Sequence, residues 1–320
     1  MMRNLFFMLA TLLIVATLIT SCKKSTPKTD ETTENVSIEE KAPFFKLSLA
    51  QWSLHRAIRN EKTLDPLDFA KKAKELGFEG IEYVSGLYSD NLKTMGMEAL
   101  QDSLKAKSEA HGVKNVLIMV DGEGNLASTD EKERNEAIEN HKKWVDAAAF
   151  LGCHAIRVNL SGAKEKEAWI ESSVKGLGKL AEYGATKNIN VIVENHGGFS
   201  SNAEMLSEVM TKINMDNCGT LPDFGNFCIT KEDGECVDSY DNYKGTEILM
   251  KHAKAVSAKS YDFDAEGNET KLDYPRLLQI VKDAGYTGFI GVEYEGNRLS
   301  EEEGIQATKD LLINASKSLN

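Results

Sequence analysis

Short apolar runs alternate with segments of helical periodicity along most of the chain. After Phe44, apolar runs recur at intervals of roughly 35–40 residues, a spacing typical of βαβ units. Runs that are apolar throughout indicate strands of a parallel sheet buried on both faces. The strand candidates, in chain order, are KLSLAQW, GIEYV, KNVLIMV, HAIRVNL, NVIVE, CGTLPD, KAVSAKS and FIGVEYE.

The segments between these runs carry helix start and stop signals. Asp65 and Pro66 form an N-cap followed by proline at the first helical position, where a missing N–H costs no hydrogen bond. Gly77 then ends the helix as a C′ glycine, directly before a strand candidate. The same arrangement returns between Asp273 and Gly285.

Eight strand candidates in one stretch of sequence predict a single-domain (β/α)8 TIM barrel, an α/β fold, over residues 44–320. We find no composition change inside this stretch that would mark a domain boundary. An open doubly wound sheet is the alternative fold, but no G-x-G-x-x-G turn follows the first strand candidate to support it.

Residues 1–43 have the composition of an export signal and a tether. Arg3 precedes an apolar run over residues 5–19, which is too short for a membrane span and typical of a secretory signal. The tetrapeptide ITSC resembles a bacterial lipobox, which implies cleavage after residue 21 and a lipid on Cys22. Residues 22–43 are too polar to offset the entropy of ordering. We expect a lipoprotein facing the periplasm or cell surface, with an uncleaved anchor or an ordinary signal as the alternatives.

The chain is acidic, with 38 Lys and Arg against 50 Asp and Glu. Because nucleic-acid binding depends on cationic side chains that neutralise phosphates, this balance argues against a nucleic-acid partner. Five cysteines are too few for a disulfide-built scaffold. Cys228 and Cys236 flank a short excursion after the sixth strand candidate, and in an exported protein they could form a disulfide. The sequence leaves that pairing open.

Three strand candidates end in a carboxylate directly after an apolar run: Glu194, Asp223 and Glu293. Glu82 follows the second candidate in a similar way. In a (β/α)8 barrel the carboxyl ends of the strands form the functional rim. Carboxylates that converge there require a cation or shared protons to offset their repulsion. The alternative is that each acid is simply solvated at a strand end.

The segments VIVENHGG, LPDFGNF and IGVEYEG, in this order, look like the xylose-isomerase-like TIM barrel superfamily. The similarity covers nearly all of 44–320 and includes the opening KLSLAQWSLHR. The family typically holds one divalent metal with Glu, Asp, His and Glu from strands 5 to 8. By position, the resemblance implies that Glu194, Asp223 and Glu293 are metal ligands, with Mn²⁺ or Mg²⁺ as the cofactor.

The expected histidine ligand is missing. The family's seventh strand usually reads like H-x-H-x-K-D, and here Ser257 stands at the position of the metal-binding histidine, while Lys259 matches the lysine. His252 should lie at the opposite end of that strand. Three arrangements stay open: three carboxylates with water or substrate, a substitute ligand from His196 or Asp262, or a site without metal.

The resemblance implies an exported sugar isomerase or epimerase that moves a proton next to a carbonyl on a sugar or keto-sugar. Glu194 and Glu293 match the family's two proton-transferring glutamates, so we predict that they are the catalytic pair. The expected partner is a small-molecule sugar, and a homo-oligomer stays open. The residues that we expect to contact substrate are Trp52, His55, Glu82, His196, Asn226, Lys259, Glu295 and Arg298.

Two other functions fit the same sequence. Proton abstraction followed by loss of a β-leaving group would make the protein a lyase or dehydratase on keto-sugars or keto-glycosides. Loss of the strand-7 histidine favours a non-catalytic carbohydrate-binding lipoprotein, whereas retention of both glutamates argues against it.

Overall fold

The computed structural model describes residues 42–319. The predicted signal peptide, the lipidation site Cys22 and nearly all of the predicted tether lie outside this range, so these assignments stay predictions. No helix of the described part is long and apolar enough to cross a membrane.

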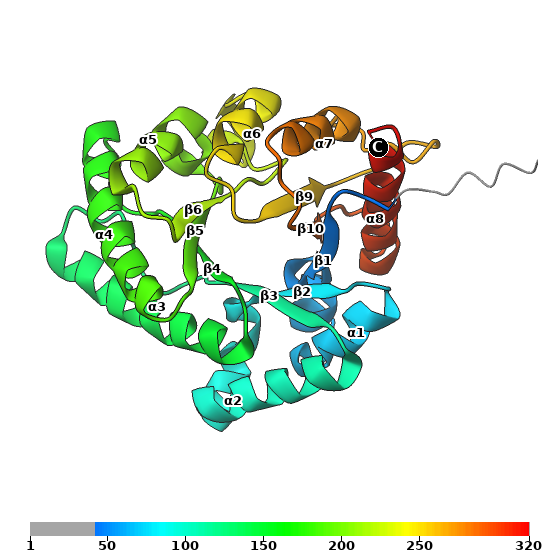
Figure 1. Cartoon of the computed structure of the whole chain (residues 1–320), viewed down its shortest axis with the longest axis horizontal. Coiled ribbons are helices and arrows are strands. Elements are labelled where there is room, and N and C mark those ends of the chain that lie inside the picture. Colours follow the sequence, from blue (N-terminus) through cyan, green and yellow to red (C-terminus); the bar gives the residue numbers. More distant parts are fainter. Residues whose placement is uncertain (1–41, 320) are drawn as a thin grey trace, which may run out of the picture. The chain divides into compact units, whose positions relative to one another are not determined.

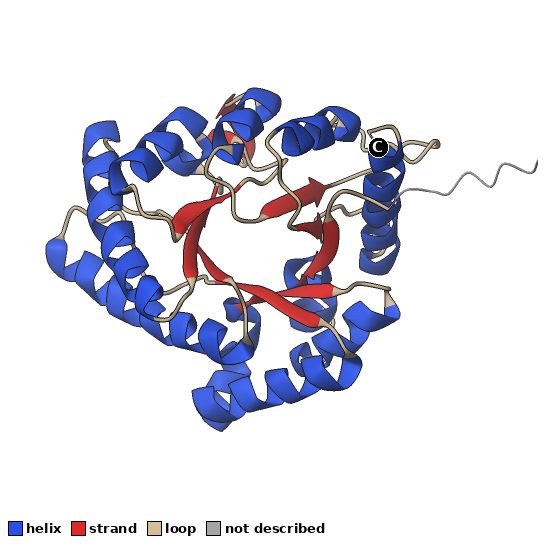
Figure 2. Ribbon diagram, in the orientation of Figure 1, coloured by secondary structure: helices blue, strands red, loops and turns tan. Residues whose placement is uncertain are grey.

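Eight parallel strands form the central sheet, and Figures 1 and 2 show them curled into a barrel. Their order in the sheet is β6-β5-β4-β3-β2-β1-β10-β9. The strands are β1 (Lys46–Ala50), β2 (Gly80–Val84), β3 (Lys114–Met119), β4 (Ala155–Val158), β5 (Asn190–Glu194), β6 (Cys218–Leu221), β9 (Val256–Ser260) and β10 (Phe289–Tyr294). Each lies within one of the eight strand candidates, most of which were predicted slightly too long.

Helices surround the strands, as Figure 2 shows. They are α1 (Phe69–Glu75), α2 (Ser89–His111), α3 (Glu131–Leu151), α4 (Lys166–Thr186), α5 (Ala203–Ile213), α6 (Asn242–Met250), α7 (Tyr274–Asp283) and α8 (Glu301–Lys317). The predicted caps are present: the side chains of Asp65 and Asp273 accept hydrogen bonds from the backbone N–H groups of Leu67 and Arg276. The TIM barrel prediction is confirmed, and the open doubly wound sheet is wrong.

The barrel closes between β6 and β9, where proline shortens a strand. Pro222 has no N–H to donate, so β6 ends at Leu221 rather than at Asp223 as predicted. The carbonyl of Pro222 still accepts a 2.9 Å hydrogen bond from the backbone N–H of Ser257, whose own carbonyl accepts one from Phe224. These isolated bonds set Asp223 opposite Ser257 across the seam.

A two-stranded hairpin grows from the loop after β6. Its strands are β7 (Cys228–Glu232) and β8 (Glu235–Ser239), which pair antiparallel and pack beside the short 3-10 helix η5 (Gly198–Ser201). Cys228 and Cys236 form a disulfide across it. The structure therefore forms the pairing that the sequence left open.

The packing of α4 against the loop after β3 can be tested with two glycines of one helix. A Cβ on Gly176 would overlap the backbone carbonyl of Leu126, whereas a Cβ on Gly178 would meet nothing within 4 Å. Gly176→Ala should destabilise the fold by about 1–3 kcal/mol. Gly178→Ala should stabilise it by up to about 1 kcal/mol, because alanine favours the helix. Urea unfolding followed by circular dichroism measures both, and equal effects would contradict this packing.

Candidate active site

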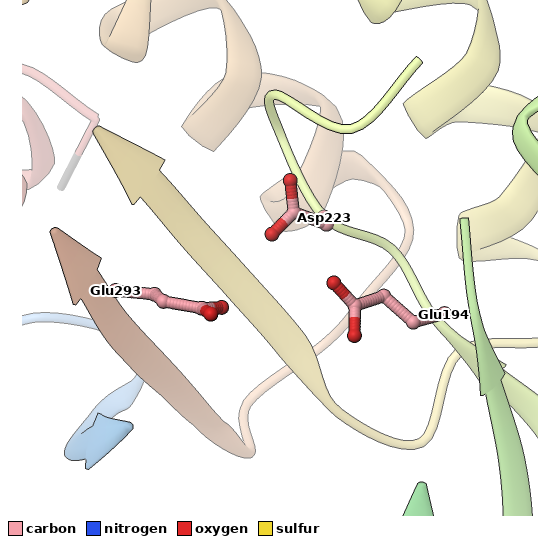
Figure 3. A group of neighbouring side chains, drawn as sticks. All are labelled: Glu194, Asp223 and Glu293. Carbon is pink, nitrogen blue, oxygen red and sulfur yellow. The ribbon is translucent and has the colours of Figure 1, made fainter. Parts of the chain in front are cut away.

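Three carboxyl groups meet inside the barrel at the carboxyl ends of its strands. Glu194 ends β5, Asp223 follows β6 and Glu293 lies near the end of β10, as Figure 3 shows. One carboxylate oxygen of each lies within 4.8 Å of the other two. All three residues are at most 3% exposed. The structure thus brings together the three residues that the sequence singled out, and we call them the carboxylate triad.

Backbone and amide groups fix the positions of these acids. One oxygen of Asp223 accepts 2.8 Å hydrogen bonds from the backbone N–H groups of Gly225 and Asn226. The side chain of Asn195 bonds both the N–H and the carbonyl of Asp223, which ties β5 to the loop after β6. Asn226 Nδ2 donates to Glu194 Oε1 at 3.0 Å. The predicted substrate residue Asn226 therefore lies against the triad.

Ser257 and Lys259 lie between two members of the triad. The Ser257 hydroxyl lies 2.8 Å from Asp223 Oδ2 and 2.9 Å from Glu293 Oε2. Lys259 Nζ lies 3.0 Å from Glu293 Oε1, 3.7 Å from Asp223 Oδ2 and 2.8 Å from Glu295 Oε1. The residue that replaces the expected histidine is thus part of the site, and the buried ammonium of Lys259 supplies positive charge beside it.

Arg157 is a site residue that the sequence analysis missed. It lies on β4, is 4% exposed, and its Nε is 2.8 Å from Glu194 Oε2. Its Nη1 is 2.8 Å from Asp121 Oδ1, and Asn159 Nδ2 donates to the same oxygen. The available signal was one charged residue inside the apolar run HAIRVNL. A lone cation in a strand buried on both faces requires an acidic partner within the barrel.

Glu82 is fully buried inside the barrel. Ser48 Oγ donates to its Oε1 at 2.6 Å, while its Oε2 has no hydrogen-bond partner. Gly291 of β10 leaves the space that this carboxyl group fills, because a Cβ there would lie 2.6 Å from Oε2. Burial raises the pKa of Glu82 to about 8, so it is mostly a neutral acid at neutral pH.

Burial and the two cations act on the triad in opposite directions. Burial raises the pKa of Asp223 to about 8, although Lys259 opposes this. Burial would also raise the pKa of Glu293, but the charge and hydrogen bond of Lys259, the Ser257 hydroxyl and the charge of Arg157 together hold that pKa below its ordinary value. The carboxylates in turn raise the pKa values of Arg157 and Lys259, which stay charged despite burial. Glu293 is therefore ionised at neutral pH, while Asp223 holds a proton readily.

Several predicted substrate residues lie at the rim instead of against the triad. Glu295 is half-buried, and Lys259, which donates a hydrogen bond to it, links it to the triad. His196 is exposed, and its backbone N–H bonds Ser200. Arg298 is bound to Asp262 at 2.6 Å and to the carbonyl of Phe263.

Trp52 and His55 stack on each other, with ring centroids 4.6 Å apart. His55 therefore covers one face of the indole that the sequence suggested as a platform for a sugar ring. His55 Nδ1 also lies 2.7 Å from the carbonyl oxygen of Trp52. The two rings form a compact unit after β1.

The substitute metal ligands considered from the sequence do not join the triad. Within the described residues, the group that could hold a metal consists of Glu194, Asp223 and Glu293 and contains no histidine. Asp262 is paired with Arg298 instead. His252 bonds Ser207 at 2.9 Å and lies at the far end of β9, as expected.

The donor set nevertheless fits a hard divalent cation. Three carboxylate oxygens within 4.8 Å of one another can converge on one ion after small side-chain shifts. Glu194 Oε2 is buried and receives no aligned hydrogen bond despite its contact with Arg157, so it keeps a free lone pair. An all-oxygen set suits Mg²⁺ or Mn²⁺ better than Zn²⁺.

Comparison with known proteins decides the family. The profile of the xylose isomerase-like TIM barrel family matches residues 70–315. The chain belongs to this family. The fold that its sequence resemblance implied is thereby confirmed at the level of the family as well as of the structure.

Solved structures with this fold include enzymes and a metal complex. D-psicose 3-epimerase from Clostridium cellulolyticum H10, solved with D-tagatose, superposes with a TM-score of 0.64 at 14% identity, covering 85% of this chain and 99% of that one. A xylose isomerase-like TIM barrel protein from Mycobacterium smegmatis, in complex with magnesium, gives a TM-score of 0.62 at 14% identity, covering 86% and 97%. At these identities the likeness concerns the fold.

One relative is similar in sequence over a short segment. The C-glycoside deglycosidase alpha subunit of Arthrobacter globiformis is 36% identical over 53 residues, which are 17% of this chain and 15% of that protein. The match thus spans only a small part of either protein's length.

The buried acid Glu82 should give the fold a measurable pH dependence. Its pKa is about 8 in the folded state against 4.5 as the ordinary value. Between these pH values the folded state binds the extra proton, so Glu82 destabilises the fold increasingly as pH rises. In EDTA, the free energy of unfolding of Glu82→Gln should rise relative to that of the wild type by up to about 1.4 kcal/mol per pH unit between pH 5 and 8. Urea unfolding at each pH measures this.

The exposed Glu98 of α2 offers a matched control. Glu98→Gln should follow the wild-type curve across this range. If the free energy of unfolding of Glu82→Gln also changed with pH in parallel with that of the wild type, Glu82 would not be a neutral acid in the folded protein.

Proposed function

We propose that this protein is an exported sugar isomerase or epimerase that transfers a proton next to a carbonyl on a sugar or keto-sugar. Glu194 and Glu293 would be the acid–base pair. The observation that carries the proposal is their burial in one carboxylate group with a separate cation beside each: Arg157 at Glu194 and Lys259 at Glu293. Export and a lipid on Cys22 remain part of the proposal, supported by the sequence signals alone.

Moving a proton next to a carbonyl requires one group that accepts it and one that returns it. Glu293 is ionised beside Lys259 and is therefore ready to accept a proton. Glu194 faces it across the triad, and Asn226 and Arg157 orient it. The ammonium of Lys259 can also stabilise an oxyanion that forms on the substrate.

A divalent metal is the proposed cofactor, with Glu194, Asp223 and Glu293 as its protein ligands. Bound there, it would supply positive charge next to the reacting carbonyl. Ser257 cannot contribute an imidazole nitrogen, so we expect Mn²⁺ or Mg²⁺ to be preferred to Zn²⁺.

A lyase reaction is the second candidate, favoured by the short similarity to a C-glycoside deglycosidase subunit. After one glutamate takes the proton next to the carbonyl, the electron pair of that C–H bond forms a C=C bond. The bond to the β-substituent breaks, and the second glutamate can protonate the leaving group. The same two residues would serve both reactions.

Removing either carboxylate should abolish proton exchange. Glu194→Gln and Glu293→Gln should each lower solvent deuterium incorporation into a reactive sugar by roughly 10²–10⁴-fold, because acid–base catalysis has this magnitude. Mass spectrometry after incubation with ketose and keto-glycoside panels in D₂O measures it. Glu171→Gln, on the exposed face of α4, is the matched control and should exchange normally. Normal exchange in both site variants would refute the acid–base assignment.

Metal binding is tested on protein stripped with EDTA. Isothermal titration with Mn²⁺ or Mg²⁺ should show one site per chain. We expect Zn²⁺ to bind this site less tightly than Mn²⁺. Asp223→Asn should weaken Mn²⁺ binding at least about tenfold, since it removes one charged ligand. Asp283→Asn, at the exposed end of α7, serves as the control. No binding to the wild type, together with full turnover in EDTA, would exclude the proposed cofactor.

A further inference from the structure

Two acids at the rim, defined as the carboxyl ends of the strands, have a connection to the triad that the proposed reaction does not use. Asp121 follows β3 and its side chain is 36% exposed. Glu295 follows β10 and its side chain is 28% exposed. Both are far more accessible than the side chains of the triad, which are at most 4% exposed. They are therefore the solvent-accessible carboxylates at the rim that connect to the buried triad.

Each of these outer carboxylates shares a buried cation with one catalytic glutamate. Arg157 lies 2.8 Å from Asp121 on one side and 2.8 Å from Glu194 on the other. Lys259 lies 2.8 Å from Glu295 and 3.0 Å from Glu293. The structure thus repeats one arrangement twice: outer carboxylate, buried cation, catalytic carboxylate.

Both cations are already occupied by these contacts. Arg157 and Lys259 are 4% and 1% exposed, and the ammonium of Lys259 also faces Asp223 at 3.7 Å. Neither can turn outward, toward a phosphate or carboxylate group of a ligand at the rim, without leaving a buried carboxylate unpaired, which is costly.

Carboxyl groups outnumber the cations at the site, so its net charge is negative even when Asp223 holds a proton. Five carboxyl groups, those of the triad and of the two outer acids, share these two cations. A dication on the triad would reduce the negative excess without reversing it.

Two arginines of the neighbouring rim loops are also engaged. Arg298 is held by Asp262 at 2.6 Å. Arg56 donates to the carbonyl of Gly296 at 2.9 Å and lies beside Glu301. Phosphate recognition relies on arginine or lysine donors that are free to bind it. These arginines are committed to partners of this chain.

We propose that Asp121 and Glu295 are specificity-determining residues that restrict the site to uncharged sugars. Their carboxylates accept hydrogen bonds from sugar hydroxyl groups and repel phosphorylated or carboxylated sugars. This inference rests on the proposed function, since it names the substrate class of the same site: neutral ketoses or keto-glycosides rather than sugar phosphates.

Binding of matched probes tests the inference separately from turnover. Isothermal titration compares D-fructose with D-fructose 6-phosphate, and D-tagatose with D-tagatose 6-phosphate, at fixed ionic strength. The wild type should bind the neutral member of each pair at least about tenfold more tightly, equivalent to about 1.4 kcal/mol. Asp121→Asn and Glu295→Gln should each lower the ratio of neutral-sugar affinity to phosphate-ester affinity several-fold. Glu208→Gln on α5, whose side chain pairs with Lys212 of the same helix, should leave the ratio unchanged.

The outcomes separate the two proposals. Equal or tighter binding of the phosphate esters by the wild type, or an unchanged ratio in both rim variants, would overturn the specificity inference. Absence of deuterium exchange into every neutral sugar, with the binding preference intact, would instead remove the isomerase proposal and leave the specificity inference standing. Thermal unfolding of each variant shows whether it is folded.

Discussion

The pairing of two buried cations with buried acids is the interaction on which this barrel depends. Four carboxyl groups, those of Glu82, Glu194, Asp223 and Glu293, lie almost fully buried within the barrel. Burying so many acids without compensation would cost several kcal/mol for each charge. Arg157 and Lys259 offset part of this cost, and protonation of Glu82 removes another part. The site is therefore built from groups that the fold tolerates only in combination.

Much of the architecture was predictable from the sequence because its signals are local. Caps such as Asp65 and Asp273 and the apolar runs between them mark where helices and strands begin and end. Glu194, Asp223 and Glu293 were predictable for the same reason, since each stands at the end of such a run. In a parallel barrel, position along a strand determines position relative to the rim.

The remainder of the site depends on contacts between distant strands. Arg157 looked like an ordinary strand residue, and its role is visible only where β4 meets β5 and the loop after β3. The hydroxyl of Ser257 bridges two acids that lie far from it in sequence. Trp52 and His55 both follow a rim strand, and that their rings stack on each other could not be read from the local pattern either. Local patterns indicate at which end of the barrel a residue lies, but they do not indicate which residues of other strands it contacts.

The disulfide hairpin has a consequence for how this barrel can diversify. Its base is closed by a 2.9 Å bond between the backbone N–H of Tyr240 and the carbonyl of Phe227. Asn242 Nδ2 bonds the carbonyl of Phe224 just before it, and Cys228 and Cys236 lock its strands together. The hairpin is thus held by its own disulfide and by backbone bonds of the loop after Asp223, and β7 packs beside η5. Changes confined to the turn between Glu232 and Glu235 would leave these anchoring bonds, and the loop that carries Asp223, unaltered.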